Sequence, residues 1–365
     1  MKITDIRFIQ TNLVLDPPFC PNWDPKPRTN FSATLTMVET DAGVVGFGSG
    51  DTMEGFAGYE KHLLGTDLFD IENHVRRLET ISFHGGRYWP IEAALWDAIG
   101  KAKGKSVAEL FGGKEKFIPA YASTGAVMSP EERAKSAELI KKLGFKALKI
   151  RVPQSNLDLG IKTLKAIRES VGDDLQIMVD LNQAWRMPGD TRDPLDFKTV
   201  SNFLDACVDY KVFWLEEPLP MEDIDGLRKL QGRGVKIAGG EMVRTIHEVR
   251  RLLDADALDV YQMDVVLSVG LHHTIEIADK AKALGKIFTP HTWSNGYGLM
   301  ANLQVTAGIG GAPFIEFPFD PPTWSTDRRD FLLAKTIEVD ENGNLWVPNE
   351  LGMGCNPNSA LLQTV

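Results

Sequence analysis

Three acidic residues follow three successive apolar runs of this 365-residue chain. Asp180 ends the run LQIMVD, Glu216 ends VFWLE, and Glu241 follows VKIAGG. If the runs are parallel strands of a barrel, their carboxyl ends meet at one mouth and bring the three carboxylates together. For any single acid, a salt bridge or a solvated loop is the more common explanation. Three acids at consecutive strand ends point instead to a shared ligand.

Such a ligand must relieve the repulsion between the carboxylates. Like charges this close repel one another, and burying them without a partner is costly. A hard divalent cation resolves both problems. An all-oxygen donor set without histidine or cysteine favours Mg²⁺, which usually keeps positions open for water or substrate. We therefore predict one Mg²⁺ per subunit at this mouth.

Basic and imidazole side chains follow other apolar runs. Lys149 and Arg151 alternate at the end of KALKIR, so both side chains lie on one face of the strand and point into the mouth. Asp264 and His291 follow the runs LDVYQM and KIFTP. A carboxylate on an adjacent strand can fix the imidazole tautomer and raise its basicity for acid–base work. The alternatives are that Arg151 merely neutralises the acids and that His291 is a core residue bonded to backbone.

The last apolar run adds another carboxyl group. Glu316 lies in FIEFPF, flanked by Phe314 and Phe317. A carboxyl group in an apolar setting tends to stay protonated. We therefore predict that Glu316 is neutral and donates a hydrogen bond to negative charge that develops during a reaction.

The elements that must position these residues alternate in type. From about residue 117, eight short apolar runs alternate with helix-like stretches such as SPEERAKSAELIKKLG. This alternation over about 200 residues predicts an α/β fold with a parallel barrel. The rival fold is a doubly wound open sheet. That fold normally has a glycine-rich phosphate turn after its first strand, and the sequence has none.

The pattern before residue 117 is different. Residues 1 to about 58 alternate like antiparallel strands, and WPIEAALWDAIGKAKG predicts a helix. The stretch LDPPFCPNWDPKPRTN between the strands is predicted to be an ordered surface loop. Because 365 residues exceed what one core usually supports, we expect separate domains. They are an α+β capping domain (1–116), a barrel (117–335) and a tail (336–365) that packs back on the capping domain.

Composition limits the partners and the compartment. A formal net charge of −10 argues against nucleic acid or an anionic membrane as the main partner. Cys20, Cys207 and Cys355 form no CxxC pair, which favours a reducing compartment. No apolar run approaches the roughly 20 residues that span a bilayer, and the start lacks the apolar core of a signal peptide. We expect a cytoplasmic homo-oligomer that acts on a small molecule.

Several motifs together resemble a known family. KIR, VDLNQAW, LEEP, GGE, QMD, TPHTW and IEF occur in an order and at a spacing similar to those of the mandelate racemase subgroup of the enolase superfamily. The likeness covers essentially the whole chain. It implies a TIM-like (β/α)7β barrel with a capping domain built from both termini.

The resemblance also implies a role for each site residue. Asp180, Glu216 and Glu241 would be the Mg²⁺ ligands. Lys149 would stand beside the substrate carboxylate, with Arg151 as the second basic residue. His291 and Asp264 would form the opposite acid–base dyad. The remaining residues would bind or orient the substrate carboxylate or the ligands; they are Glu316, Asn182 and Glu217.

The implied reaction is abstraction of the proton α to a carboxylate through an enediolate. Acid-sugar dehydratases of this family use it to form a 2-keto-3-deoxy product. Arg151 stands where a racemase would carry lysine, and arginine is a poor base. Dehydration needs only one base and one acid, and His291 could serve as both. A racemase, epimerase or cycloisomerase is the alternative. A non-catalytic acid-sugar binder is a further one, although a binder has no need of the dyad.

Specific contacts with the substrate are expected from loops. The loops at about 16–30 and 49–56 offer Lys26, Arg28, Asp51 and Thr52 for hydroxyl groups, and Arg28 could bind a second carboxylate. The long segment RMPGDTRDPLDFK could reach the far end of the substrate through Arg186 or Arg192. For each of these residues, an ordinary surface position is the alternative.

Overall fold

The structure is a computed structural model that describes residues 1–50 and 52–363 of the chain. Within these residues, the larger sheet contains eight parallel strands in the order β10-β9-β8-β7-β6-β5-β4-β11. In chain order they are β4 (Phe117–Ser123), β5 (Ala147–Arg151), β6 (Gln176–Asp180), β7 (Val212–Glu216), β8 (Lys236–Gly239), β9 (Val260–Tyr261), β10 (Ile287–Phe288) and β11 (Ile315–Pro318).

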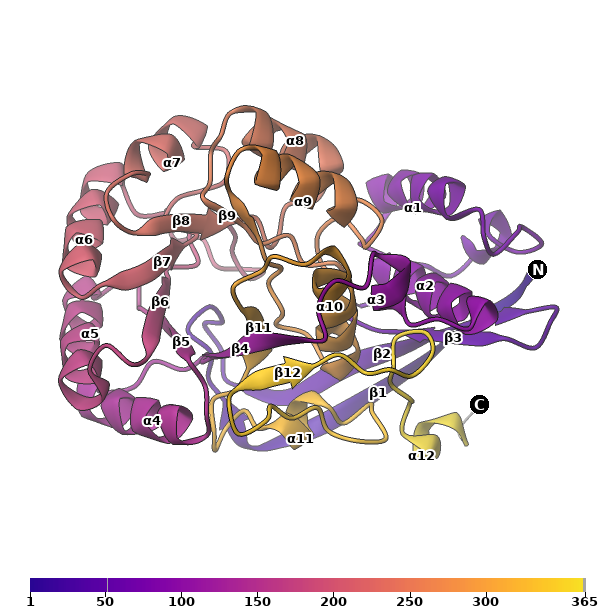
Figure 1. The fold of residues 1–365 in the computed structure, drawn as a ribbon, viewed down its shortest axis with the longest axis horizontal. Helices are drawn as coiled ribbons and strands as arrows, with labels where there is room; N and C mark the ends of the chain where they lie inside the picture. The colour runs from indigo at the N-terminus through magenta and orange to yellow at the C-terminus, as the bar shows by residue number, and fades with distance from the viewer. Residues whose placement is uncertain (51, 364–365) are drawn as a thin grey trace.

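Over the same residues, one helix connects each of these strands to the next. The helices are α4 (Pro130–Lys142), α5 (Leu157–Val171), α6 (Phe197–Asp209), α7 (Ile224–Leu230), α8 (Ile246–Asp254), α9 (Thr274–Ala283) and α10 (Gly296–Ile309). Figure 1 shows α4 to α9 around the outside of the curled sheet. The α/β class with a curled parallel sheet is therefore confirmed. In the described part of the chain no backbone ladder joins β10 to β11, so closure of the barrel stays a prediction.

Side chains alternate across the parallel strands and thereby separate two layers. Leu148, Ile150, Val179 and Leu215 belong to the large cluster that includes buried helix residues. The alternate positions form a second buried cluster, which consists of Tyr121, Ala147, Met178, Trp214, Ala238 and Val260. A period of two places the next residues of this second set, Lys149, Asp180 and Glu216, on the same inward face. The polar groups therefore form the next layer of inward-facing side chains, toward the carboxyl ends of the strands from this second apolar cluster.

The N-terminal part of the chain forms a separate antiparallel sheet. The strands β1 (Ile3–Phe19), β2 (Arg28–Thr40) and β3 (Val45–Gly48) pair in sequence order, and the helices are α1 (Ile71–His84), α2 (Trp89–Lys103) and α3 (Val107–Leu110). These elements contain a hydrophobic cluster of their own. They lie at one side of the curled sheet (Figure 1). The buried Glu92 of α2 accepts hydrogen bonds from the backbone of Leu271 and His272, which ties α2 to the loop after β9. The limits of the expected capping domain stay predictions.

The surface loop between the first two strands is shorter than predicted. β1 continues through Pro17 and Pro18 to Phe19, which pairs with Arg28 at the start of β2. Prolines are tolerated there because β1 is an edge strand, whose outer N–H groups need no partner. The remaining loop, residues 20–27, consists of exposed and half-buried residues apart from the buried Pro21, as the prediction of an ordered surface loop requires. Its Trp23 contacts the rings of Phe19 and Trp293.

The C-terminal residues contact both parts of the molecule. The short helix α11 (Thr326–Arg329) follows β11, and β12 (Asn344–Trp346) pairs antiparallel with β4. Further along, the backbone N–H of Met353 donates to Asp97 of α2 at 2.7 Å. The last described helix is α12 (Ser359–Leu362), and in Figure 1 this helix lies on the side of the antiparallel sheet.

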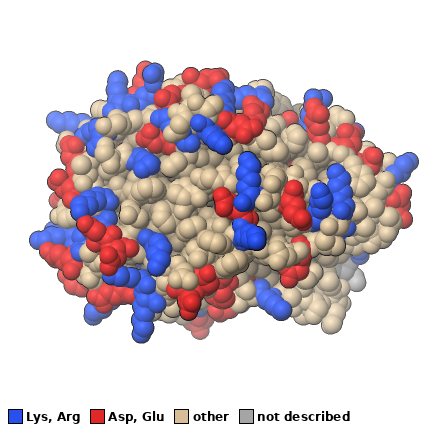
Figure 2. All heavy atoms as spheres, viewed as in Figure 1, with Lys and Arg blue, Asp and Glu red and all other residues tan. Residues whose placement is uncertain are grey.

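Charged side chains of both signs are interspersed on the face shown in Figure 2, mostly toward its periphery. No helix in the described residues combines the length and the apolar character that a membrane span requires.

Candidate active site

The structure brings the three predicted acidic residues together. Asp180 and Glu216 end the adjacent strands β6 and β7 and are register partners, and Glu241 lies just beyond β8. One carboxylate oxygen from each of the three lies within 4.8 Å of the other two. All three side chains are buried, with at most 1% of their surface exposed. Burial and the nearby Glu216 raise the pKa of Glu241, although His291 opposes this shift.

Neighbouring donors hold one oxygen of each carboxylate in place. Trp214 Nε1 and Gln262 Nε2 donate to Glu216 Oε2, at 3.0 and 2.9 Å. Trp185 Nε1 donates to Glu241 Oε1 at 2.7 Å. The backbone N–H of Asn182 donates to Asp180 Oδ1 at 2.7 Å. Each carboxylate is therefore oriented by bonds that leave its second oxygen for other partners.

The donor set fits a hard divalent cation. Asp180 Oδ2 and Glu241 Oε2 are buried and lie beside basic side chains: Arg151 and Lys149 pair with the first oxygen, and His291 lies next to the second. Together with Glu216 they offer an all-oxygen set on one side of the cluster, which suits Mg²⁺ better than a softer metal. Within the part of the chain that the structure describes, this is the one group of three such side chains close enough to share an ion.

Two basic side chains compensate the acids. Lys149 Nζ lies 2.5 Å from Glu216 Oε1, 2.7 Å from Glu316 Oε1 and 3.7 Å from Asp180 Oδ2. Because Lys149 is fully buried, these charge-assisted contacts replace its hydration.

Arg151 contacts the same cluster from the next inward position of β5. It forms an ion pair with Asp180, donates to Asn182 Oδ1 at 3.3 Å, and donates to the carbonyl of Thr124 at 3.2 Å. Its guanidinium lies 4.7 Å from the ring centroid of Trp23. These contacts hold Arg151 as a fixed cation at the mouth.

His291 and Asp264 form a hydrogen-bonded pair across the cluster. His291 Nδ1 lies 3.0 Å from Asp264 Oδ2. Asp264 Oδ1 accepts hydrogen bonds from the Val266 backbone at 2.9 Å and from Asn302 Nδ2 at 3.1 Å. With Nδ1–H donating to Asp264, the other ring nitrogen, Nε2, faces the acids at 3.3 Å from Glu241 Oε2.

The charges around His291 strengthen it as a base. Burial alone would lower the pKa of the imidazole. Glu241, Glu316 and Asp264 outweigh burial and raise that pKa to about 9.

The prediction that Glu316 is protonated is wrong. Burial would raise the pKa of Glu316, but Lys149, His291 and Arg151 lower it to about 2. The Glu316 carboxylate also accepts a hydrogen bond from the Thr292 backbone at 2.5 Å. The two flanking phenylalanines suggested an apolar setting. The cations that decide the charge come from other strands.

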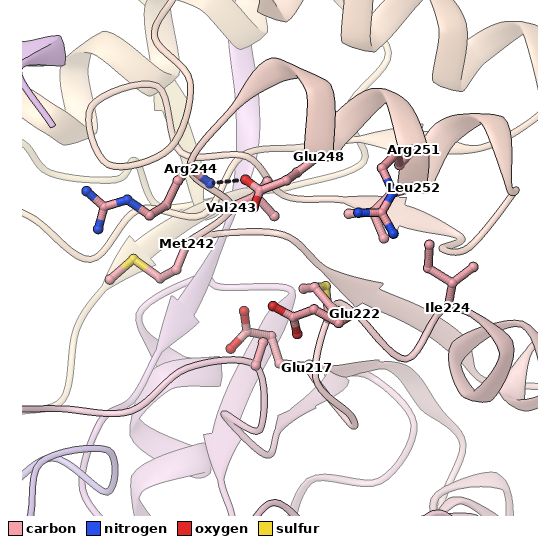
Figure 3. Close-up of a pocket in the computed structure, with 11 residues that line it drawn as sticks. Glu217, Glu222, Ile224, Met242, Val243, Arg244, Glu248, Arg251 and Leu252 are labelled. Carbon is pink, nitrogen blue, oxygen red and sulfur yellow. Dashed lines mark hydrogen bonds between the residues drawn. The ribbon is translucent and has the colours of Figure 1, made fainter. Parts of the chain in front are cut away.

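Asn182 and Glu217 follow the acidic strand ends in left-handed backbone conformations, with φ of 47° and 43°. Asn182 contacts Arg151 and lies at the mouth. The fully buried Glu217 has no hydrogen-bond partner for either oxygen among the described residues. Burial, Glu241 and Glu216 raise its pKa well above the usual range. Glu217 faces a neighbouring cavity of about 210 Å³, which Figure 3 shows with Glu222 and Met242.

A second cavity of about 210 Å³ opens directly onto the site. Glu241, His291, Arg151 and Asn182 line it on one side, and Trp23, Arg28 and Phe31 line it from the N-terminal sheet and its loop. Of the other loop residues predicted to meet the substrate, Lys26 and Thr52 do not line this cavity. Lys26 and Thr52 are exposed, and Asp51 lies outside the described residues.

The arginines of the segment after β6 also lie elsewhere. Arg186 donates to the carbonyls of Asn182 and Trp185, at 2.9 and 2.8 Å. Arg192 pairs with Asp190. Both arginines line an adjacent cavity, so the structure does not bring them to His291.

Four residues that support the site were not identified from the sequence alone. Trp185, Trp214 and Gln262 orient the acidic residues, and Asn302 orients Asp264. Trp185 and Gln262 lie inside the motifs VDLNQAW and QMD, so their place in those motifs was an available signal. Trp214 and Asn302 gave none, because a tryptophan in a strand and an asparagine in a helix resemble ordinary core and surface positions.

Comparison with known proteins agrees with this geometry. Residues 131–361 match the family described as enolase C-terminal domain-like. Arabinonate dehydratase from Saccharolobus solfataricus is 30% identical over 268 residues, which cover 72% of this chain and 68% of that protein. D-galactarolactone cycloisomerase from Agrobacterium fabrum is 26% identical, covering 98% of this chain and 97% of that protein.

Solved structures show the same relationship. A member of the enolase superfamily from Polaromonas sp. JS666 superimposes with a TM-score of 0.87 at 26% identity, covering 100% of this chain and 97% of that one. The chain therefore belongs to the enolase superfamily, which confirms the family that the motifs indicated. Its relatives include acid-sugar dehydratases, a cycloisomerase and a racemase.

Proposed function

We propose that this chain is a Mg²⁺-dependent acid-sugar dehydratase that removes the proton α to a carboxylate. One observation carries the proposal: Asp264 holds His291 with Nε2 toward Glu241 of the acidic cluster, and His291 and Glu241 line the same cavity. A base beside a cation site is the arrangement that abstraction of a weakly acidic α proton requires.

Each of the site residues has a role in the proposed reaction. Asp180, Glu216 and Glu241 hold the ion, which when bound would stabilise negative charge on the substrate carboxylate. His291 takes the α proton at Nε2, and Asp264 holds the ring and stabilises the imidazolium. Lys149 does not line the cavity, and its buried positive charge acts on the substrate carboxylate from behind the acidic cluster. The ionised Glu316 positions Lys149 through the 2.7 Å contact.

Dehydration is favoured over racemisation by Arg151. A racemase needs a base on each face of the α carbon. Arg151 is held in place by Asp180, Asn182 and Trp23, and arginine is a poor base. His291 can return its proton to the departing β-hydroxyl group on its own face. Similarity to D-galactarolactone cycloisomerase keeps cycloisomerisation, which uses the same α-proton abstraction, as the second candidate.

The test is turnover of a panel of aldonic and aldaric acids with Mg²⁺ in D₂O. We expect at least one acid to give a semicarbazide-reactive 2-keto product. Enzyme treated with EDTA serves as the background control. Exchange of the α proton without loss of water would favour an epimerase or cycloisomerase. Binding without exchange on any acid would favour a non-catalytic binder.

Arg151→Lys tests the assignment of the two faces. The variant keeps a cation, so we expect turnover within about tenfold of wild type. It should also gain slow α-proton exchange on the opposite epimer, since lysine loses its proton more readily than arginine. NMR of both epimers in D₂O measures this exchange. Rapid exchange of both epimers by the wild type would instead make Arg151 or Lys149 a base.

A further inference from the structure

In the part of the chain that the structure describes, Arg28 is the cation that lines the active-site cavity and keeps its terminal nitrogens available. Its Nε donates to Asp24 Oδ2 at 2.8 Å. Its Nη2 contacts only the sulfur of Met187, at 3.8 Å, a weak acceptor. Among the described residues, no protein oxygen accepts a hydrogen bond from Nη1 or Nη2 of this side chain. The outer pair of nitrogens is therefore free to bind a ligand.

The local structure fixes Arg28 before any ligand binds. Arg28 is the first residue of β2 and pairs with Phe19 of β1. Asp24 accepts from the backbone N–H of Lys26 with one oxygen, at 3.0 Å, and from Arg28 with the other. Asp24 is only 12% exposed, so this turn is partly shielded from water. An arginine held in this way loses little side-chain freedom when it binds an anion.

The other cations of the site, Lys149 and Arg151, are already paired with acidic side chains. Lys149 is fully buried between Glu216, Glu316 and Asp180 and does not line the cavity. Arg151 lines it but is paired with Asp180.

The remaining wall near Arg28 is largely apolar and aromatic. It includes Trp23, Phe31, Trp185, Met187, Leu267 and Trp293. A second charged group of a ligand in this cavity would therefore meet Arg28. The planar pair Nη1 and Nη2 matches the two oxygens of a carboxylate.

We infer that the substrate is a hydroxylated dicarboxylic acid, whose second carboxylate binds Arg28 while the first lies at the acidic cluster. This inference rests on the proposed function and narrows it from acid sugars in general to diacids of the aldaric type. Asp24 acts as a positioning residue for Arg28. The size of the cavity, about 210 Å³, suits a small diacid.

The experiment compares matched pairs of acids that differ at one end only: galactarate with galactonate, and glucarate with gluconate. Calorimetry with Mg²⁺ present gives the Kd of each acid, and kcat/KM is measured wherever turnover occurs. Wild type should bind at least one diacid more tightly than its monoacid partner. Arg28→Met should weaken binding of that diacid by about 10- to 100-fold. Binding of the matched monoacid should change by less than about threefold.

Two further variants control for general effects of a substitution on folding or on the net charge. Asp24→Asn leaves Arg28 in the chain but removes its anchor, so the preference for the diacid should fall while monoacid binding stays unchanged. Arg192→Met removes a cation that pairs with Asp190 outside this cavity, and it should leave the preference unchanged. Thermal unfolding of each variant verifies that it is folded.

The outcomes separate this inference from the proposed function. Equal weakening of diacid and monoacid by Arg28→Met, or no preference for a diacid in wild type, would overturn the inference. If no acid shows α-proton exchange, the proposed function fails, but the binding ratios still decide the role of Arg28. If monoacids turn over and the ratios do not depend on Arg28, the proposed function stands and the diacid assignment is lost.

Discussion

Glu241→Gln should abolish Mg²⁺ binding and reduce turnover by at least about 10³-fold, because a bound cation supplies several kcal/mol of charge stabilisation in such chemistry. The substitution is conservative in shape, since the amide oxygen can still accept the hydrogen bond of Trp185 Nε1. It removes one of three buried carboxylates that converge on one point. The fold should persist, and the melting temperature of the metal-free protein should change by only a few degrees. Calorimetric Mg²⁺ titration, turnover and thermal unfolding measure the three effects.

Glu222→Gln is the matched control for this variant. Glu222 is an exposed glutamate on the loop before α7 and is not part of the acidic cluster. Its substitution should leave Mg²⁺ affinity and turnover within about twofold of wild type. Wild-type protein should lose activity with EDTA and regain it with Mg²⁺, whereas Zn²⁺ should substitute poorly at an all-oxygen site. Full activity of the chelated protein would contradict the proposed metal chemistry.

Asp264→Asn should lower turnover by about 10²-fold or more while Mg²⁺ affinity changes little. The amide keeps size and polarity but removes the charge that favours the imidazolium, and it can hold the ring in the wrong tautomer. His291 must be neutral to accept a proton, so activity rises with pH through its pKa. Asp264 is one of the groups that raise this pKa. Without its charge, the acidic limb of the pH–rate profile should move to lower pH.

His291→Asn completes this test and His247→Asn controls for it. The first variant should lose both α-proton exchange and turnover. The second replaces an exposed histidine of α8 and should change neither. If Asp264→Asn leaves turnover and the acidic limb unchanged, the pair is not a functional unit. Exchange at the wild-type rate in His291→Asn would place the base on the opposite face.

The acidic cluster could be predicted from the sequence because the topology of a parallel sheet does the positioning. Each of Asp180, Glu216 and Glu241 ends or follows a strand, and parallel strands bring such positions to one edge whatever the details of packing. The pairing of Asp264 with His291 follows from the same rule, since β9 and β10 are neighbours.

Features that depend on the particular contacts of one side chain or strand were not predicted correctly. The charge of Glu316 is set by Lys149, which lies on another strand of the sheet, and not by the phenylalanines beside it in the chain. Arg186 looked available because its backbone acceptors, the carbonyls of Asn182 and Trp185, are local and leave no sequence signal. The prolines after Val14 suggested a loop, although an edge strand accepts them.

The position of β4 has a consequence for synthesis of the chain. β4 is the first strand of the parallel sheet to emerge from a ribosome, and its partner on one side, β11, pairs Ile315 with Ala120 across about 195 residues. At a translation rate of roughly 5–20 residues per second, about 10–40 s pass between the synthesis of β4 and the synthesis of β11. β12 pairs with the start of β4 and emerges later still. Throughout that interval an apolar strand edge is open to other chains, so the yield of folded protein should depend on translation speed and on chaperones that cover such edges.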